Sequence, residues 1–584
     1  MSRLAPRPTS RLRTAGARLA CWTAVLAVAA ACGPAGAGGA PAPGGTSVGS
    51  AVAPAARVDA RELLRDSWVT DGRRGWFVDG AASADRSPFS LYETAWRLRL
   101  AALGGGGART GVDPERLRLW VSPAERGRLD SSGLPAVAQV DLAVDALLAV
   151  GGTVARTDVA RTLEALRSGG DYRTGPSAQR PDPGATAVAV RVLTRLGLPV
   201  PEPVRQANSH ALARLSARDA AAAPGEVVPV LQTAAALGVT GADRDHAAAL
   251  AEAAERALAR LAADPVRLAW EAALRDAAGP LGARLPRFAA STCDGRVLRD
   301  GGIGLPGAEQ SDPQATYWAL RLGCSAVRAP AAGAHSRAGW PTEQAREAAL
   351  SASASALAVA RRTGQTAEFA GPLAREVREV WLPRLDHPAP YDTAQLVDRV
   401  NLRLVTRALG DAVYRDVDRR LPAPSLRGVR PTDDALLLLS TLDARGSATA
   451  ERALCAAGSP LRTAVAGSGT SIVRAAWLAA AADACHDPDL HRRALAAARA
   501  VRAGTALYRS GTAVSLEASV MGTWIDRPRT DAVTAWANAG LCRGDRCAET
   551  PRQLRTTDHT PLRTLAVLLT AHTGDYGGLF PVSF

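Results

Sequence analysis

A short pattern recurs along this chain at intervals of about 40–50 residues, and it limits the possible folds to arrays of paired helices. In each copy, a turn containing Pro, Asp or Ser leads into Thr or another small residue and then into an apolar segment. Asp or Ser caps a helix N-terminus well, and Pro fits its first turn. The clearest copies cover residues 89–96, 182–187, 312–318, 390–394, 431–435 and 530–536, and weaker copies lie near residues 140, 227, 469 and 559.

The helices that follow these turns are expected to form an inner layer. Residues 185–196 carry only Arg191 and Arg195 as charges, so this helix should be largely buried. Segments 205–218 and 251–261 are amphipathic and should form an outer layer. About eleven or twelve hairpins fit the chain, and a ring of this type closes with about six. We therefore predict an all-α fold of two linked α/α toroids, at residues 57–330 and 331–584.

Composition supports helices and narrows the chemistry. Hydrophobic residues, mainly Ala, make up 47% of the 584 residues, and aromatic residues make up only 4%. The net charge is +14 and every basic residue is Arg, which excludes a Schiff-base Lys and a Walker-type phosphate loop. The Arg residues form no basic block, so no nucleic-acid partner is expected. Their excess reflects either the codons of a GC-rich genome or an anionic partner such as a membrane surface.

The first 32 residues are typical of an export signal. Five Arg residues precede a short apolar run over residues 19–31, which is too short for a membrane span. Small residues then lead into Cys32-Gly33, which resembles the lipobox of bacterial lipoproteins, although Ala29 stands where Leu is usual. The resemblance implies a lipidated Cys32 that ties the protein to the outer face of a membrane. Cleavage after Ala31 without lipidation is the alternative. Residues 33–56 are expected to form a flexible tether.

Six further cysteines fall into three sequential pairs. In an oxidising compartment we expect disulfides within these pairs, although buried free thiols remain the alternative. Cys485, His486 and His491 have a spacing that suits metal ligands, but no second cluster completes a set of four. We therefore expect no metal and no other cofactor. The six residues are Cys293, Cys324, Cys455, Cys485, Cys542 and Cys547.

Two of the turns resemble the repeat of the prenyltransferase and squalene-cyclase superfamily, in which a Gly-Gly-aromatic turn precedes an Asp-x-x-x-Thr helix start. Gly169 to Tyr172 precede Asp182–Thr186, and Gly301 to Gly304 precede Asp312–Thr316. Residues 87–96 are similar to the S-A-Y-D-T-A-W stretch of class II diterpene cyclases. The resemblance covers most of the chain after residue 60 and implies two linked α-barrels.

The catalytic residues of that superfamily are mostly missing. Its class II enzymes protonate a double bond with a D-x-D-D acid, which requires a carboxyl group kept protonated. The nearest match, residues 431–434, lacks the first Asp and retains Asp433 and Asp434. Asp433 is the candidate acid, with Asp434 favouring its protonated form, and the alternative is that both residues cap a helix. Export also argues against a cyclase, because prenyl diphosphates are cytosolic.

Several carboxylates and aromatic residues stand at or near the predicted starts of inner helices. Together they would ring one mouth of a toroid and line a pocket, as in glycan-active α/α toroids that use two carboxylates. Helix capping and core packing are the alternatives. The candidates are Glu93, Asp182, Asp312, Asp392 and Asp531, with Trp76, Tyr92, Trp96, Tyr317, Trp318 and Tyr391.

These observations predict an exported, lipid-anchored protein with a terpenoid cyclase-like α/α-toroid fold. We expect it to lack proton-initiated cyclisation and to bind an apolar or envelope-derived ligand. The alternatives are an active cyclase that uses Asp433, a glycan-active enzyme, or a non-catalytic scaffold of the cell envelope.

Overall fold

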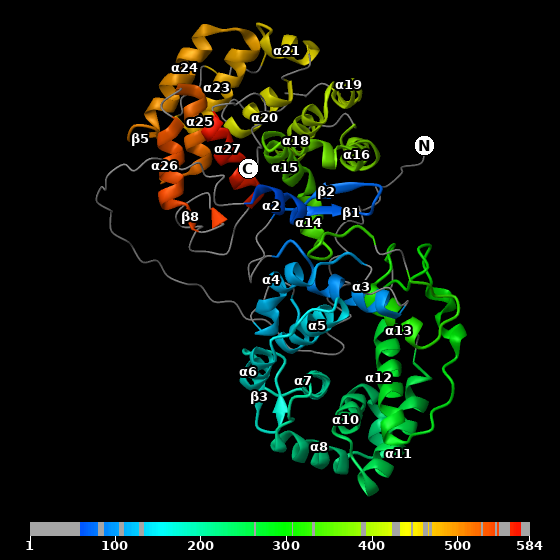
Figure 1. Ribbon diagram of the computed structural model, residues 1–584. Coiled ribbons are helices and arrows are strands. Elements are labelled where there is room, and N and C mark those ends of the chain that lie inside the picture. Colours follow the sequence, from blue (N-terminus) through cyan, green and yellow to red (C-terminus); the bar gives the residue numbers. More distant parts are fainter. Residues whose placement is uncertain are drawn as a thin grey trace, which may run out of the picture. The chain divides into compact units, whose positions relative to one another are not determined.

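The computed structural model of this protein is mainly helical, as the sequence predicted, with only small sheets (Figure 1). The export signal, Cys32, the tether, Tyr391 and Asp392 lie outside the residues that it describes. Those residues are 59–79, 87–103, 110–127, 133–261, 264–305, 308–329, 333–386, 393–422, 433–444, 448–459, 465, 470–526, 530–543, 546–547 and 561–573.

The chain divides into two compact units. Unit 1 comprises the described residues from Ser90 to Gly333. Unit 2 comprises the described residues before Ser90 and those from Ala334 onward. Residues 59–79 and 87–89, which the sequence analysis grouped with the first domain, therefore pack with the C-terminal half of the chain. Unit 1 is thus an insertion into the sequence of unit 2.

Six helices of unit 1 contact one another in a circular order, which runs α3–α5–α7–α10–α12–α13 and returns to α3. We call these the central helices of unit 1. The remaining helices lie outside this order, as α6, α8 and α11 do in Figure 1. The central helices are α3 (Leu91–Leu103), α5 (Ala136–Ala149), α7 (Pro183–Arg195), α10 (Pro224–Leu237), α12 (Pro265–Leu281) and α13 (Pro313–Arg321). The others are α4 (Pro114–Glu125), α6 (Arg156–Leu166), α8 (Glu202–Arg214), α9 (Ala217–Ala222), α11 (Gly241–Leu258) and the 3-10 helix η3 (Ala290–Arg296), with strands β3 (Arg167–Ser168) and β4 (Asp171–Tyr172).

Unit 2 has the same organisation. Its central helices contact one another in the order α15–α18–α20–α23–α25–α27 and back to α15, and α19, α21, α24 and α26 lie around them in Figure 1. These central helices are α15 (Ala349–Arg362), α18 (Thr393–Leu409), α20 (Asp434–Ala444), α23 (Ile472–Cys485), α25 (Leu516–Asp526) and α27 (Pro561–Thr573).

The remaining elements of unit 2 lie outside this order. The helices are α2 (Ala60–Ser67), α14 (Glu343–Glu347), α16 (Thr366–Glu376), the π-helical turn η4 (Val377–Trp381), α17 (Leu382–Leu385), α19 (Asp411–Arg420), α21 (Ala448–Cys455), α24 (Pro488–Ala500) and α26 (Thr530–Gly540). The strands are β1 (Trp68–Thr70), β2 (Gly75–Phe77), β5 (Arg502–Ala503), β6 (Leu507–Ser510), β7 (Ala513–Val514), β8 (Cys542–Arg543) and β9 (Arg546–Cys547), and all of their pairings are antiparallel. One helix differs from expectation. The copy of the pattern at residues 530–536 was expected to begin an inner helix, but α26 lies outside the circular order.

Polar side chains fix where many central helices begin. Asp182 and Asp312 accept hydrogen bonds at 2.7 Å from the backbone N–H groups of Ala185 and Ala315, so they cap α7 and α13. The same role falls to Asp264 at α12, Asp433 at α20, Ser471 at α23 and Ser515 at α25. These side chains occupy backbone donors that a helix leaves unpaired in its first turn. Each capping side chain fixes the residue at which its helix begins, and this is the physical basis of the repeated pattern.

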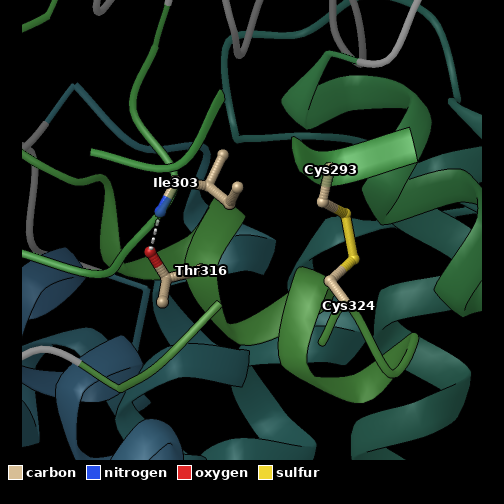
Figure 2. Close-up of a disulfide and its surroundings, with 4 residues drawn as sticks. All are labelled: Cys293, Ile303, Thr316 and Cys324. Atoms are coloured by element: carbon tan, nitrogen blue, oxygen red, sulfur yellow. Dashed lines mark hydrogen bonds between the residues drawn. A yellow bond between two sulfur atoms is a disulfide. The ribbon is translucent and has the colours of Figure 1, made fainter. Parts of the chain in front are cut away.

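A hydroxyl in the first turns of four central helices, α7, α13, α15 and α25, ties each of them to a preceding segment. The Thr316 hydroxyl donates to Asp312 O at 2.8 Å and accepts the backbone N–H of Ile303 at 2.9 Å (Figure 2). Thr186 binds the N–H of Tyr172 at 3.0 Å in the same way. Unit 2 repeats the contact twice with Ser in place of Thr. Ser353 accepts the N–H of Phe77, and Ser519 accepts the N–H of Tyr508.

Close packing explains the glycines of these turns. A Cβ on Gly302 would lie 2.4 Å from the Cβ of Ser311 and 2.8 Å from the Thr316 hydroxyl oxygen. Both distances are shorter than real Cβ contacts, so only Gly allows this backbone to approach the helix start.

Two of the predicted cysteine pairs lie at disulfide distance. The sulfur atoms are 2.01 Å apart in Cys293–Cys324 (Figure 2) and 1.99 Å apart in Cys455–Cys485. Because Cys485 is bonded to Cys455, it is not available as a metal ligand. Cys542 and Cys547 face each other in the register of β8 and β9, and their side chains lie outside the description, so a third disulfide stays a prediction. Within the described ranges, no helix combines the length and the apolar character that crossing a membrane requires.

Candidate functional site

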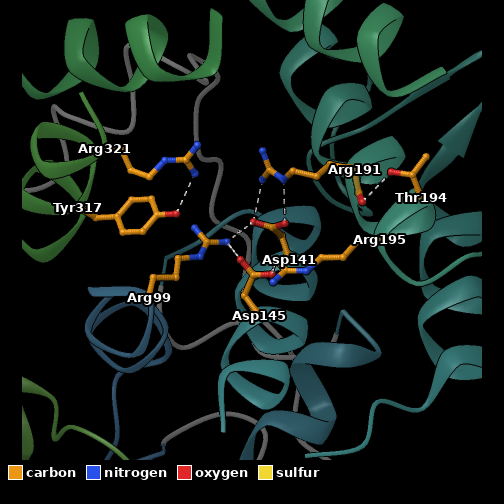
Figure 3. A network of polar contacts seen from close by, with 8 residues as sticks. All are labelled: Arg99, Asp141, Asp145, Arg191, Thr194, Arg195, Tyr317 and Arg321. Carbon is orange, nitrogen blue, oxygen red and sulfur yellow. Dashed lines mark hydrogen bonds and ion pairs between the residues drawn. The ribbon is translucent and has the colours of Figure 1, made fainter. Parts of the chain in front are cut away.

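Polar side chains from five central helices of unit 1 gather near Asp141 and Asp145 of α5, and Figure 3 draws those of four helices. Figure 3 shows them pointing toward one another from α3, α5, α7 and α13. Because they come from different helices, the arrangement depends on contacts between neighbouring central helices. We call the following residues the central cluster: Arg99, Asp141, Asp145, Arg191, Arg195, Asp276, Tyr317 and Arg321.

Two carboxylates hold most of the central cluster together. Asp141 accepts hydrogen bonds from Arg99 at 3.1 Å and from the Nη2 and Nε of Arg191 at 2.8 and 3.2 Å. Asp145 pairs with Arg99 and with Arg195. On the far side, the Arg321 guanidinium lies 2.5 Å from Asp276 and donates to the Tyr317 hydroxyl at 3.3 Å. Paired carboxylates and guanidiniums satisfy each other away from bulk water, which a lone buried charge cannot do.

Burial and charge oppose each other within the central cluster. Burial raises the pKa of Asp141, but the positive charges of Arg191 and Arg99 outweigh it, and this pKa lies below its usual range. Burial lowers the pKa of Arg99, and the attraction of Asp141 does not fully restore it. Four guanidiniums face three carboxylates, so the ionised cluster carries an excess of one positive charge.

Part of the central cluster is surrounded by protein and yet open to solvent. The side chains of Arg191, Arg195 and Asp276 expose 41%, 45% and 46% of their surfaces. Protein atoms nevertheless enclose the guanidinium of Arg191 on all sides, and they partly enclose the charged groups of Arg195 and Asp276. A side chain on a convex surface does not combine these two properties. These side chains therefore line a solvent-accessible space inside unit 1.

Four aromatic side chains from α3 and α13 adjoin the central cluster. The ring of Trp96 lies 5.4 Å from the rings of both Tyr317 and Trp318, and 6.5 Å from that of Tyr92. The Arg99 guanidinium lies 4.1 Å from the centre of the Trp96 ring, a distance typical of a cation–π contact. The indole N–H groups of Trp96 and Trp318 are buried and have no acceptor among the described residues. Both orphaned groups are donors.

The predicted pocket residues divide between structural positions and this aromatic group. Tyr92, Trp96, Tyr317 and Trp318 were predicted together, and the structure brings them together. Asp182 and Asp312 cap helices, and Asp312 also accepts the Tyr92 hydroxyl at 2.8 Å. Glu93 pairs with Arg97 one turn later on α3. Asp531 lies in α26, and its side chain lies outside the description.

Trp76 belongs to unit 2 rather than to this aromatic group. The Arg346 guanidinium lies 3.4 Å from the centre of its ring and 2.7 Å from Glu376, which is fully buried. Burial raises the pKa of Glu376, although Arg346 opposes the rise. Trp76 therefore packs against the Arg346–Glu376 ion pair of unit 2.

Asp433 and Asp434 stand at the start of α20 in unit 2. Asp433 caps this helix through the N–H of Leu436 at 3.1 Å. Asp434 accepts three hydrogen bonds, from Ser471 at 3.0 Å and from Arg474 and the Trp477 indole at 3.1 Å each. A carboxylate surrounded by donors, one of them charged, is held as an acceptor. The arrangement therefore suits a structural carboxylate better than a proton donor.

Most of the central cluster was not predicted from the sequence, although its helices carry a signal. Helix α5 has only two charged residues, Asp141 and Asp145, and α7 has only Arg191 and Arg195. Each pair is four residues apart and so lies on one face of its helix. Opposite charges at the same spacing on two apolar helices are a pattern that predicts their contact.

Two buried carboxyl groups between α11 and α12 form a separate feature of unit 1. Burial, together with the hydrogen bond and charge of Glu255, raises the pKa of Glu271 to about 7. Arg275 lies 2.6 Å from Glu255 and 3.5 Å from Glu271, and Arg267 lies 3.6 Å from Glu271. The charges of Arg275 and Arg267 lower the pKa of Glu271, but by less than burial and Glu255 raise it.

The raised pKa of Glu271 predicts a stability that depends on pH. The folded state holds the Glu271 proton more tightly than the unfolded chain, so its contribution is complete below about pH 4.5 and is lost as the pH rises through about 7. We expect the free energy of unfolding to fall by about 2 kcal/mol between pH 5 and 8. Urea denaturation at a series of pH values measures this, and Glu271→Gln should flatten the dependence. An equally steep dependence in the variant would contradict the assignment.

Among the described residues, no group of three or more His, Cys, Asp or Glu side chains is placed to hold a metal ion. No protein-family model matches this chain, and no match was found among curated proteins or among solved structures. The functional argument therefore depends on the geometry of the two units.

Proposed function

We propose that this chain is an exported, lipid-anchored protein of the terpenoid cyclase-like α/α-toroid type, which binds a ligand within unit 1 and does not carry out proton-initiated cyclisation. The observation that carries the proposal is the set of charged side chains in unit 1 that are surrounded by protein and yet open to solvent. If unit 1 needed these side chains only for stability, apolar residues of similar size would give a higher free energy of unfolding.

Two features support the toroid. The central helices of each unit contact one another in a closed order. The contact between a helix-start hydroxyl and a preceding backbone N–H occurs in both units, at Thr186, Thr316, Ser353 and Ser519. A repeated local contact of this kind is expected where one hairpin unit is used many times.

The contacts of Asp434 weigh against the cyclase alternative. Its three donors hold it as an acceptor, and Asp433 is engaged with the helix N-terminus. An acid that protonates an alkene needs a protonated carboxyl group aimed at its substrate. Neither residue meets this condition.

Two cysteine pairs at disulfide distance support export, because disulfides persist mainly outside the cytosol. If Cys32 carries the anchor, a radioactive fatty acid fed to producing cells should label the protein. The label should be absent from Cys32→Ala, whereas Cys21→Ala, which changes a cysteine inside the predicted signal, should keep it. A parent protein without label would remove the lipid anchor from the proposal.

Arginine-selective modification with phenylglyoxal tests binding in unit 1. Arg191, Arg195 and Arg321 should react, whereas Arg399, whose side chain is fully buried in unit 2, should not. A small-molecule extract of the cell envelope should slow the reaction at the three unit 1 residues. It should leave the exposed Arg161 and Arg492 unchanged. Reaction at Arg191 and Arg195 as slow as at Arg399 would contradict an accessible interior, and unchanged rates with the extract would contradict a bound envelope ligand.

A further inference from the structure

We infer that the ligand of unit 1 carries a phosphate group that Arg191 and Arg321 bind. The organic part of this ligand packs against the aromatic side chains of α3 and α13. This inference rests on the proposed binding function and names the chemistry of the ligand. It concerns only residues of unit 1.

Several hydrogen-bond donors in or next to the central cluster have no acceptor among the described residues. Asp141 engages the Nε and one Nη of Arg191, and the other Nη has no partner among the described residues. The orphaned indole N–H of Trp96 belongs to a side chain that is only 3% exposed, and Trp318 adds a second such donor. Buried polar groups normally find partners, so orphaned donors indicate a missing acceptor. The excess of one positive charge favours an anionic acceptor over a neutral one.

The directions of the donors favour a phosphate over a carboxylate. Arg191 and Arg321 come from α7 and α13, which are not neighbours in the circular order, and Figure 3 shows them turned toward the same space. A carboxylate offers two oxygens in one plane, whereas a phosphate offers three or more oxygens in several directions. Because the chain contains no Lys, the choice of Arg carries no information, and the inference depends on number and convergence.

Asp276 occupies the position of a competitor. Asp276 is the most exposed carboxylate of the central cluster at 46%, and it pairs with Arg321 at 2.5 Å. Burial raises the pKa of Asp276, and the charges of Arg321 and Arg191 oppose this rise. Asp141 and Asp145, by contrast, are almost fully buried. A phosphate that enters the accessible space would bind Arg321 at the place where the Asp276 carboxylate now pairs with it. The ligand would therefore exchange with Asp276 for this guanidinium.

Calorimetric titration of the full chain tests the inference with three phosphate probes: inorganic phosphate, phenyl phosphate and dihexanoyl phosphatidic acid. Phenyl phosphate should bind more tightly than inorganic phosphate and than benzoate, because it combines the oxyanion with a ring. Tightest binding of the phosphatidic acid would identify a lipid source for the phosphate, and tightest binding of phenyl phosphate a soluble one. Arg321→Ala should weaken phenyl phosphate binding about 10-fold or more, and Arg161→Ala, an exposed control, should not.

Asp276→Asn provides the test that misfolding cannot imitate, because it should tighten phosphate binding severalfold by removing the competing carboxylate. Unchanged or weaker binding in this variant would overturn the inference. Protection of Arg191 and Arg321 by the envelope extract, without binding of any phosphate probe, would overturn the phosphate assignment and leave the proposed function in place. Absence of both results would remove both.

Discussion

Replacing Asp443 with Ala should lower the free energy of unfolding of unit 2 by about 3–5 kcal/mol. Asp443 lies on α20 and is completely buried. Its two oxygens accept the Nε of Arg399 and the Nε of Arg403, each at 2.7 Å, and both arginines come from α18. Without the carboxylate, Arg399 would still donate to the backbone carbonyl of Pro422, but its fully buried guanidinium would lose the negative charge of Asp443.

The cost arises from the charge that is left behind and not from the pair that is lost. A buried ion pair adds little net stability compared with apolar residues, because desolvation cancels most of the attraction. Removing one partner leaves the full desolvation penalty of the other. Arg403 also donates to a second carboxylate, Asp418, at 2.5 Å, and should therefore keep one ion pair in the variant.

Hydrogen exchange of α18 and α20 during denaturant titration measures this effect on unit 2. Asp443→Asn keeps an acceptor oxygen at the same place and should lose less stability than Asp443→Ala. Asp489→Ala is the matched surface control, because its pair with Arg492 is exposed and should be worth less than 1 kcal/mol. A loss below 1 kcal/mol in Asp443→Ala would contradict the expected penalty of removing a buried carboxylate from two guanidiniums.

The helix starts were the part of this fold that the sequence could predict. Capping is local, since the side chain of Asp182 or Asp312 binds a backbone N–H only three residues later. Composition, spacing and turn residues therefore carry the information directly. The aromatic group of α3 and α13 was also predicted, because its members stand next to such starts.

Contacts between distant segments could not be predicted in the same way. Phe77 donates its N–H to Ser353 across 276 residues, and nothing in the local pattern at either place indicates the other. Asp79 likewise accepts the N–H groups of Leu562 and Arg563 at 3.0 Å and so caps α27 from the opposite end of the chain. These contacts follow from the insertion of unit 1 into the sequence of unit 2, which the repeat alone does not reveal.

The central cluster escaped prediction for a different reason. Arg191 and Arg195 were noted only as the few charges of a mostly apolar helix, although they pair with carboxylates of the neighbouring helix α5. The repeat also misled the assignment of α26, because the cap pattern at Thr530 marks a helix start without saying which layer the helix joins. Capping chemistry is the same in both layers.

Loss of the Cys455–Cys485 disulfide should destabilise unit 2 by about 3–4 kcal/mol, since the bond closes a loop of sequence separation 30 between α21 and α23. In the chain-entropy account, the bond acts by restricting the unfolded chain, so its effect depends on this separation. The Cys293–Cys324 bond closes a loop of separation 31 in unit 1 and should have a similar effect there.

The two bonds therefore make a controlled comparison within one chain. Cys455→Ser with Cys485→Ser should lower the stability of unit 2 alone, and Cys293→Ser with Cys324→Ser should lower that of unit 1 alone, as measured by hydrogen exchange of α23 and α13 under oxidising conditions. Under reducing conditions the parent and both double variants should converge, because the unfolded chains then have equal freedom. A difference that persists in reductant would mean that the cysteine side chains stabilise the units by packing. Free thiols at these four positions in protein unfolded without reductant would mean that the bonds do not form.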